Sequence, residues 1–195
     1  MRVLKWVAIG LAGLVALLVG IGLLLPSTWS VERTVTVSAA PETIRPFLDT
    51  PRQWPVWSAW NNAKYPDMVV EYEGPARGVG SAWKWQGESS GAGRLEITRS
   101  DAAGVGYRLA FADFPPIDGT MALEASGAAT TVRWAMAGDV CGNLLARFFV
   151  PFMGDMMTAE LDEGLAKLKG LAEAAPPPAA APAAAEAEAD VPAAE

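Results

Sequence analysis

The stretch GRLEITRSDAAGVGYRLAF, residues 93–111, decides the fold of this chain. Leu95 and Ile97 alternate with polar residues in its first half, and Tyr107 and Leu109 alternate with other residues in its second half. Successive side chains of a β-strand point to opposite faces, so each half predicts a strand with one apolar face. The glycine-containing segment between the two halves predicts a hairpin turn.

The same alternation recurs on both sides of this hairpin. Strands are predicted over residues 31–37, 68–73, 81–86, 93–99, 106–111, 119–125 and 130–137. No helix-length segment separates the last six strands, so hairpins connect them and a parallel α/β sheet is excluded. The apolar face of the sheet carries Trp83, Trp85, Leu95, Ile97, Tyr107, Leu109, Phe111, Met121, Leu123, Val132, Trp134 and Met136. The other face carries Lys84, Arg94, Glu96, Arg108, Glu124 and Arg133, a pattern typical of cross-strand pairs on a solvated surface.

Helices are predicted at the two ends of this strand series. A short helix over residues 43–48 follows the first strand, with Pro46 and Pro51 limiting its length. A long helix over residues 143–172 has apolar residues at helical spacing, and Pro151 kinks or interrupts it. This helix covers the apolar face, so the expected fold is α+β, a curved antiparallel sheet of about seven strands around a C-terminal helix.

An uncharged apolar run precedes the first strand, from Trp6 to Leu25. A helix rises ~1.5 Å per residue, so the run is long enough to cross the ~30 Å hydrocarbon core of a membrane. Arg2 and Lys5 precede the run and Arg33 follows it, which favours a single-pass anchor in the cell (inner) membrane with the domain outside the cytoplasm. A cleaved signal peptide is the alternative, but the run is longer than a signal core and no good cleavage site follows it.

Domain boundaries are therefore expected at residues 1–27 for the anchor, 28–173 for the folded domain and 174–195 for a disordered tail. The tail consists almost entirely of alanine, proline and acidic residues, which cannot bury enough apolar surface to fold. The formal net charge is −7, and an acidic chain lacks the basic patch that nucleic acid requires. There is no histidine and only Cys141, so Cys/His zinc sites, a Ser-His-Asp triad and an internal disulfide are excluded.

Six segments taken in order carry a resemblance to a known superfamily. They are Pro41-Glu42-Thr43-Ile44, residues 54–60 (WPVWSAW), Gly78-Val79-Gly80, residues 93–97 (GRLEI), residues 130–134 (TTVRW) and residues 164–169 (GLAKLK). Over residues 28–173 the chain resembles the START-like (SRPBCC) superfamily, which includes the polyketide cyclase/dehydrase and lipid-transport families. The resemblance implies a helix-grip (START/Bet v 1-like) fold with a cavity for an apolar molecule between sheet and helix. It implies no universal catalytic set, so no catalytic residue, metal or cofactor is carried over.

The expected function is a membrane-anchored binding domain for a lipid or other apolar small molecule, with the C-terminal helix and the Asp113–Asp118 loop as gates. The ligand-binding residues are predicted to be Trp57, Trp60, Trp83, Trp85, Tyr107, Phe111, Trp134, Phe148, Phe152 and Met156. The same residues would also suit an ordinary packed core. A cyclase- or hydrolase-like enzyme and a ligand-free interaction module remain as alternatives. The acidic pairs Glu71/Glu73 and Asp113/Asp118 are predicted to be exposed, which disfavours a general base.

Overall fold

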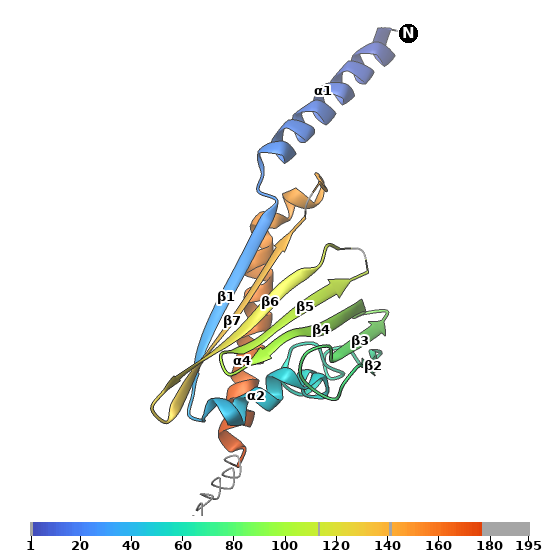
Figure 1. The fold of residues 1–195 in the computed structure, drawn as a ribbon. Helices are drawn as coiled ribbons and strands as arrows, with labels where there is room; N and C mark the ends of the chain where they lie inside the picture. Colours follow the sequence, from blue (N-terminus) through green and yellow to red (C-terminus); the bar gives the residue numbers. More distant parts are fainter. Residues whose placement is uncertain (1, 113, 141, 177–195) are drawn as a thin grey trace, which may run out of the picture.

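The computed structural model describes residues 2–112, 114–140 and 142–176, and Figure 1 shows how its elements are arranged. Within these residues seven strands form one antiparallel sheet in the order β1-β7-β6-β5-β4-β3-β2. The strands are β1 (Thr28–Val37), β2 (Val69–Glu73), β3 (Ala82–Gly87), β4 (Gly91–Asp101), β5 (Gly104–Phe111), β6 (Ile117–Ser126) and β7 (Ala129–Asp139). The helices are α1 (Arg2–Leu24), α2 (Pro41–Asp49), η1 (Pro51–Gln53), α3 (Trp54–Trp57), η2 (Ala146–Phe148) and α4 (Val150–Ala174). The predicted α+β helix-grip fold is confirmed.

The sheet buries one face against α4 and exposes the other, as the alternation predicts. Trp83, Ile97, Tyr107 and Val132 all point to the covered face and are almost completely buried. The charged residues of the exposed face form cross-strand ion pairs. These pairs are Lys84–Glu73, Arg94–Glu73 at 2.9 Å, Arg108–Asp118 at 2.9 Å and Arg133–Glu32 at 3.3 Å. Exposed pairs of this kind add little stability, so the covered face holds the domain together.

Two prolines affect the helices, one of them differently from the prediction. Pro46 does not limit α2 but lies inside it, because Ile44 and Leu48 are fully buried and hold the helix against the sheet. The predicted interruption of the long helix near Pro151 is confirmed, although α4 begins at Val150 and not near residue 143. Pro151 is the second residue of α4, where its missing N–H costs nothing, and the preceding residues form the separate turn η2.

The long helix α4 is fixed to the sheet by both apolar and polar contacts. Leu161, Leu165 and Leu168 are buried along one side of it. On its edge, Arg33 of β1 donates from Nε and Nη2 to the two carboxylate oxygens of Asp162, at 2.6 and 2.7 Å. This two-pronged pair fixes the position of α4 along β1.

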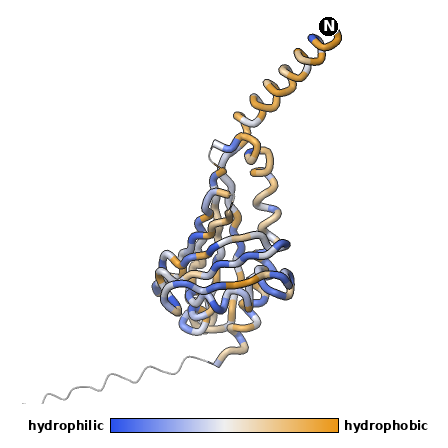
Figure 2. The backbone as a smooth tube through the Cα atoms, turned by 90° about the vertical axis from the view of Figure 1, so that its right-hand side faces the viewer, coloured by the Kyte–Doolittle hydropathy of each residue, from blue (hydrophilic) through white to orange (hydrophobic). Residues whose placement is uncertain are grey.

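Helix α1 extends away from the domain, and its residues are almost uniformly hydrophobic (Figures 1 and 2). Its segment Val3–Leu24 is long and apolar enough to cross a membrane. Because β1 begins just after α1, the strand ends Thr28, Phe111, Ile117 and Asp139 lie at what we call the anchor-side end of the sheet. The opposite strand ends form the distal end.

Candidate functional site

A small cavity, which we call the inner cavity, lies between the covered face of the sheet and the α3 region. Its volume is about 20 Å³. It is lined by Trp54, Ser58, Trp60, Trp83, Trp85, Leu95, Tyr107, Leu109, Trp134 and Met136. A space of this size holds about one water molecule, whereas benzene needs a cavity of roughly 150 Å³. In this conformation the inner cavity cannot contain an organic ligand.

Aromatic rings fill the space where the fold would otherwise leave room for a ligand. The ring centroids of Trp54 and Tyr107 are 5.0 Å apart, and those of Trp57 and Trp134 are 5.3 Å apart. Both contacts are edge-to-face, which is a favourable geometry for aromatic pairs. Gly119 permits this packing, because a Cβ there would lie 2.0 Å from the Tyr107 ring.

Hydrogen bonds hold these rings in place. Trp54 Nε1 donates to the Leu48 carbonyl at 2.8 Å, and Trp134 Nε1 donates to Tyr107 Oη at 2.6 Å. Burial raises the pKa of Tyr107 well above its ordinary value, so the phenol stays neutral. The indole N–H groups of Trp83 and Trp85 are buried without a partner among the described residues. The rings therefore form a fixed core in which the indole N–H groups of Trp54 and Trp134 have acceptors.

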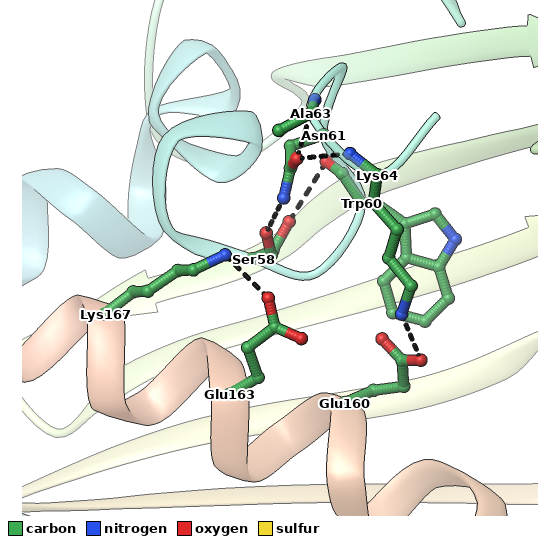
Figure 3. A network of polar contacts seen from close by, with 8 residues as sticks. All are labelled: Ser58, Trp60, Asn61, Ala63, Lys64, Glu160, Glu163 and Lys167. Atoms are coloured by element: carbon green, nitrogen blue, oxygen red, sulfur yellow. Dashed lines mark hydrogen bonds and ion pairs between the residues drawn. The ribbon is translucent and has the colours of Figure 1, made fainter. Parts of the chain in front are cut away.

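A polar network closes the loop that follows α3 against α4 (Figure 3). Lys64 Nζ donates to Glu160 of α4 at 2.5 Å. Within the loop, Asn61 Nδ2 donates to the Ser58 carbonyl at 2.8 Å, and its Oδ1 accepts from the backbone N–H of Ala63 at 3.0 Å. These contacts hold the loop, and with it Trp60, over the inner cavity.

A second, larger space opens at the anchor-side end of the sheet, and we call it the outer groove. Its volume is about 250 Å³. It is lined by Trp29, Leu109, Phe111, Phe114, Pro115, Ile117, Met136, Gly138, Asp139, Val140, Met153, Met156 and Met157. The only ionisable side chain among these described lining residues is that of Asp139. Thioethers and aromatic rings adapt to irregular apolar molecules, so this lining suits such a ligand.

The outer groove is the better candidate of the two sizeable spaces at this end. A wider depression of about 560 Å³ lies beside it and shares Trp29, Pro115 and Asp139 with it. That depression also includes Thr28, Ser30 and Asp118, and it is more open to solvent. The groove exceeds the ~150 Å³ that accommodates benzene and approaches the ~300 Å³ of the smallest drug-sized sites.

The residues predicted to bind ligand separate into three groups in the structure. Trp60, Trp83, Trp85, Tyr107 and Trp134 line the inner cavity, and Phe111 and Met156 line the outer groove. Trp57, Phe148 and Phe152 line neither space. On the helix side, Met156 lines the outer groove, whereas Phe152 is 61 % exposed and Phe148 packs against α1.

Asp113 of the predicted gate and Cys141 lie outside the described residues. Glu71 is exposed and Glu73 is partly so, with Glu73 ion-paired to Lys84. Among the described residues, no three His, Cys, Asp or Glu side chains come together in a group that could hold a metal. Glu71 and Glu73 therefore contribute no ionisable group to the inner cavity or to the outer groove.

Eleven of the thirteen groove residues are absent from the predicted ligand-binding set, among them Trp29, Phe114, Met153 and Met157. The methionines had a signal in the sequence, because Met153, Met156 and Met157 follow the i, i+3, i+4 spacing of one helix face. Trp29 and Phe114 had none, since one lies at the start of a strand and the other in a loop.

Comparisons with known proteins agree with this architecture. The family described as polyketide cyclase/dehydrase and lipid transport matches residues 28–173. Protein CV1439 from Chromobacterium violaceum is 18 % identical, with a TM-score of 0.53 over 74 % of this chain and 96 % of its own. The di-domain ARO/CYC protein StfQ of the steffimycin pathway is 12 % identical, with a TM-score of 0.56 over 75 % of this chain and 51 % of its own. Norcoclaurine synthase from Thalictrum flavum is 13 % identical, with a TM-score of 0.53 over 74 % of this chain and 94 % of its own. No curated protein gave a match.

Proposed function

Because the chain belongs to the polyketide cyclase/dehydrase and lipid transport family, we propose that it is a membrane-anchored binding protein for an apolar small molecule or lipid, held in the outer groove. The observation that carries the proposal is the groove itself, an apolar space of about 250 Å³ lined by three methionines of α4. Helix α1 would anchor the domain in the cell membrane, with the domain outside the cytoplasm.

Both size and polarity favour the groove over the inner cavity. A ligand bound there would be held by the removal of apolar surface from water, at ~25 cal/mol per Å². The volume suits a small ring system or one segment of an acyl chain, with the rest of a longer ligand extending out of the groove.

Organic extraction of the purified full-length chain, followed by mass spectrometry, tests this proposal. We expect a co-purifying apolar compound in a fixed ratio to protein. Met153→Trp places a large ring in the groove and should remove the compound, as should Met157→Trp. Ala166→Trp is the matched control, because Ala166 lies on an exposed face of α4 and lines neither space. Equal amounts of compound in wild type, groove variants and control would refute the proposal.

One observation supports a second candidate, an acid–base enzyme of the same family. Asp139 is the only ionisable side chain in the described groove lining, so any proton transfer by this site would use it. Asp139→Asn separates the two functions. A binding protein would release the same compound from this variant as from wild type, whereas an enzyme would accumulate a compound of different mass.

A further inference from the structure

Five large apolar side chains are exposed near the junction with α1 and at the outer groove. They are Leu145, Phe149, Phe152 and Met156, together with Phe114 from the loop before β6. We call these five residues the apolar rim, and each is between 61 and 73 % exposed. Phe149, Phe152 and Met156 follow a spacing of three and four residues, so they lie along one side of the start of α4, and Leu145 precedes them just before η2. Soluble surfaces rarely gather large apolar side chains in this way, and such patches mark a binding surface.

Contacts between α1 and the η2 region fix the position of the rim relative to the anchor. A Cβ on Gly22 would lie 2.9 Å from Leu144 Cγ and 3.2 Å from Phe148 Cε2, so these side chains pack directly on α1. Arg147 Nη1 donates to the carbonyls of Leu23 and Leu25, both at 3.4 Å. These carbonyls lie at the C-terminal end of α1, where carbonyl groups lack partners within the helix. Figure 2 shows the hydrophobic character of α1 continuing into the adjoining turn.

The length of α1 gives the depth in the membrane at which these contacts would lie. Its apolar segment of 22 residues spans about 33 Å, close to the ~30 Å hydrocarbon core of a membrane. If α1 crosses the membrane, Leu24 marks the hydrocarbon boundary on the domain side. Gly22 then lies inside that boundary, and so do the Leu144 and Phe148 side chains packed on it. Arg147 lies at the boundary, where arginine places its charge toward water and its stem in lipid.

From this geometry we infer that the apolar rim inserts into the same bilayer that α1 crosses, so that the outer groove opens onto lipid. The inference rests on the membrane anchor of the proposed function, but not on a bound ligand. Phe114 and Met156 belong to both the rim and the groove lining, so the groove and the inserted surface are continuous. Leucine and phenylalanine side chains favour lipid over water, and four of the five rim residues are of these two types.

The contact is apolar rather than electrostatic. None of the five rim residues is charged, and Arg147 is the one basic side chain described next to them. The chain as a whole carries a formal charge of −7, which opposes docking through anionic headgroups. Insertion should therefore require no anionic lipid.

The test places a fluorescent probe at the rim of the full-length chain in phosphatidylcholine vesicles. In a Cys141→Ser background, Phe152→Cys and Val79→Cys are each labelled with an environment-sensitive dye. Val79 is the matched control because it is 60 % exposed, against 61 % for Phe152, and lies in the β2–β3 loop at the distal end. We expect lipids carrying a nitroxide near the top of the acyl chain to quench the dye at position 152 and leave position 79 unquenched. Added anionic lipid should not strengthen the quenching at position 152.

Two further results decide the inference. The double variant Phe149→Gln/Phe152→Gln, labelled at Leu145→Cys, should lose most of the quenching that the single Leu145→Cys variant shows. Equal quenching at positions 152 and 79, or a blue-shifted dye at 152 that lipid nitroxides do not reach, would overturn the inference. The second of those results would indicate a protein partner or a second copy of this chain. Quenching at 152 with no extractable compound would leave the inference standing and contradict the proposed ligand binding.

Discussion

Replacing Gly164 by alanine should destabilise the domain although glycine is a poor residue in a helix. Alanine in a helix interior gains about 1 kcal/mol over glycine. At Gly164, however, a Cβ would lie 2.8 Å from Trp134 Cζ3 and 3.5 Å from Trp57 Cζ3. The Trp134 ring cannot move aside easily, because its Nε1 is bonded to Tyr107 Oη at 2.6 Å. Overpacking of this kind costs about 2–3 kcal/mol, which leaves a net loss of about 1–2 kcal/mol.

Gly170 provides the matched control on the same helix. It lies within α4, and a Cβ there would meet nothing within 4 Å. Gly170→Ala should therefore stabilise the domain by up to about 1 kcal/mol. For a domain of this size, 1 kcal/mol corresponds to about 2–4 °C in Tm. Thermal unfolding of the full-length chain in detergent micelles, followed by tryptophan fluorescence, should show Gly164→Ala lower and Gly170→Ala higher than wild type. A shift of both variants in the same direction would refute the tight contact between α4 and the sheet.

Two more predictions concern buried and exposed polar groups. Tyr107→Phe leaves the buried Trp134 N–H without an acceptor and should cost about 1–3 kcal/mol in urea unfolding, whereas Tyr72→Phe at the surface should be nearly neutral. Hydrogen bonds from Arg33 to Asp162 and from Lys84 to Glu73 lower the pKa of both carboxyls below their usual values. Stability from these pairs is present above the unfolded pKa of about 4 and is lost as pH falls through the lower folded values. Tm should thus fall below about pH 4 and stay level from pH 5 to 8, since the chain has no histidine; a midpoint near neutral pH would contradict this.

The sheet could be predicted because apolar and polar residues alternate along each strand, and this alternation shows which face of the strand is buried. Leu95 and Ile97 point one way and Arg94 and Glu96 the other, and their pairing partners in the neighbouring strands repeat the pattern. The strand ends in the structure differ from the predicted ends by only a few residues. Strand β4, for example, begins at Gly91 and not at residue 93. Hairpin connections predict the order of the six strands from β2 to β7, which the structure confirms. The pairing of β1 with β7 was not predicted from the sequence.

The site was harder to predict because apolar periodicity does not distinguish a ring that lines a cavity from one that fills it. Trp83 and Trp134 have the same pattern in either case, and only the packing of Trp54 and Trp57 decides that the inner cavity closes to about 20 Å³. Residues before α4 were misplaced for a different reason. The helical period was continued through η2, whose tighter turn changes the direction of Phe148 relative to α4.

The position of the groove matters more for function than its size, because apolar molecules leave a bilayer slowly. Moving one methylene from an apolar environment into water costs about 0.8 kcal/mol, so a chain of about ten methylenes meets a barrier of about 8 kcal/mol. A groove that opened at the distal end would impose that full cost on every ligand. In the proposed arrangement the mouth bordered by Phe114 and Met156 lies against lipid, and a ligand exchanges one apolar environment for another. The anchor then lowers the barrier to loading as well as keeping the domain near its source of ligand. Loading should therefore slow when Phe149 and Phe152 of the rim are made polar, although neither residue lines the groove.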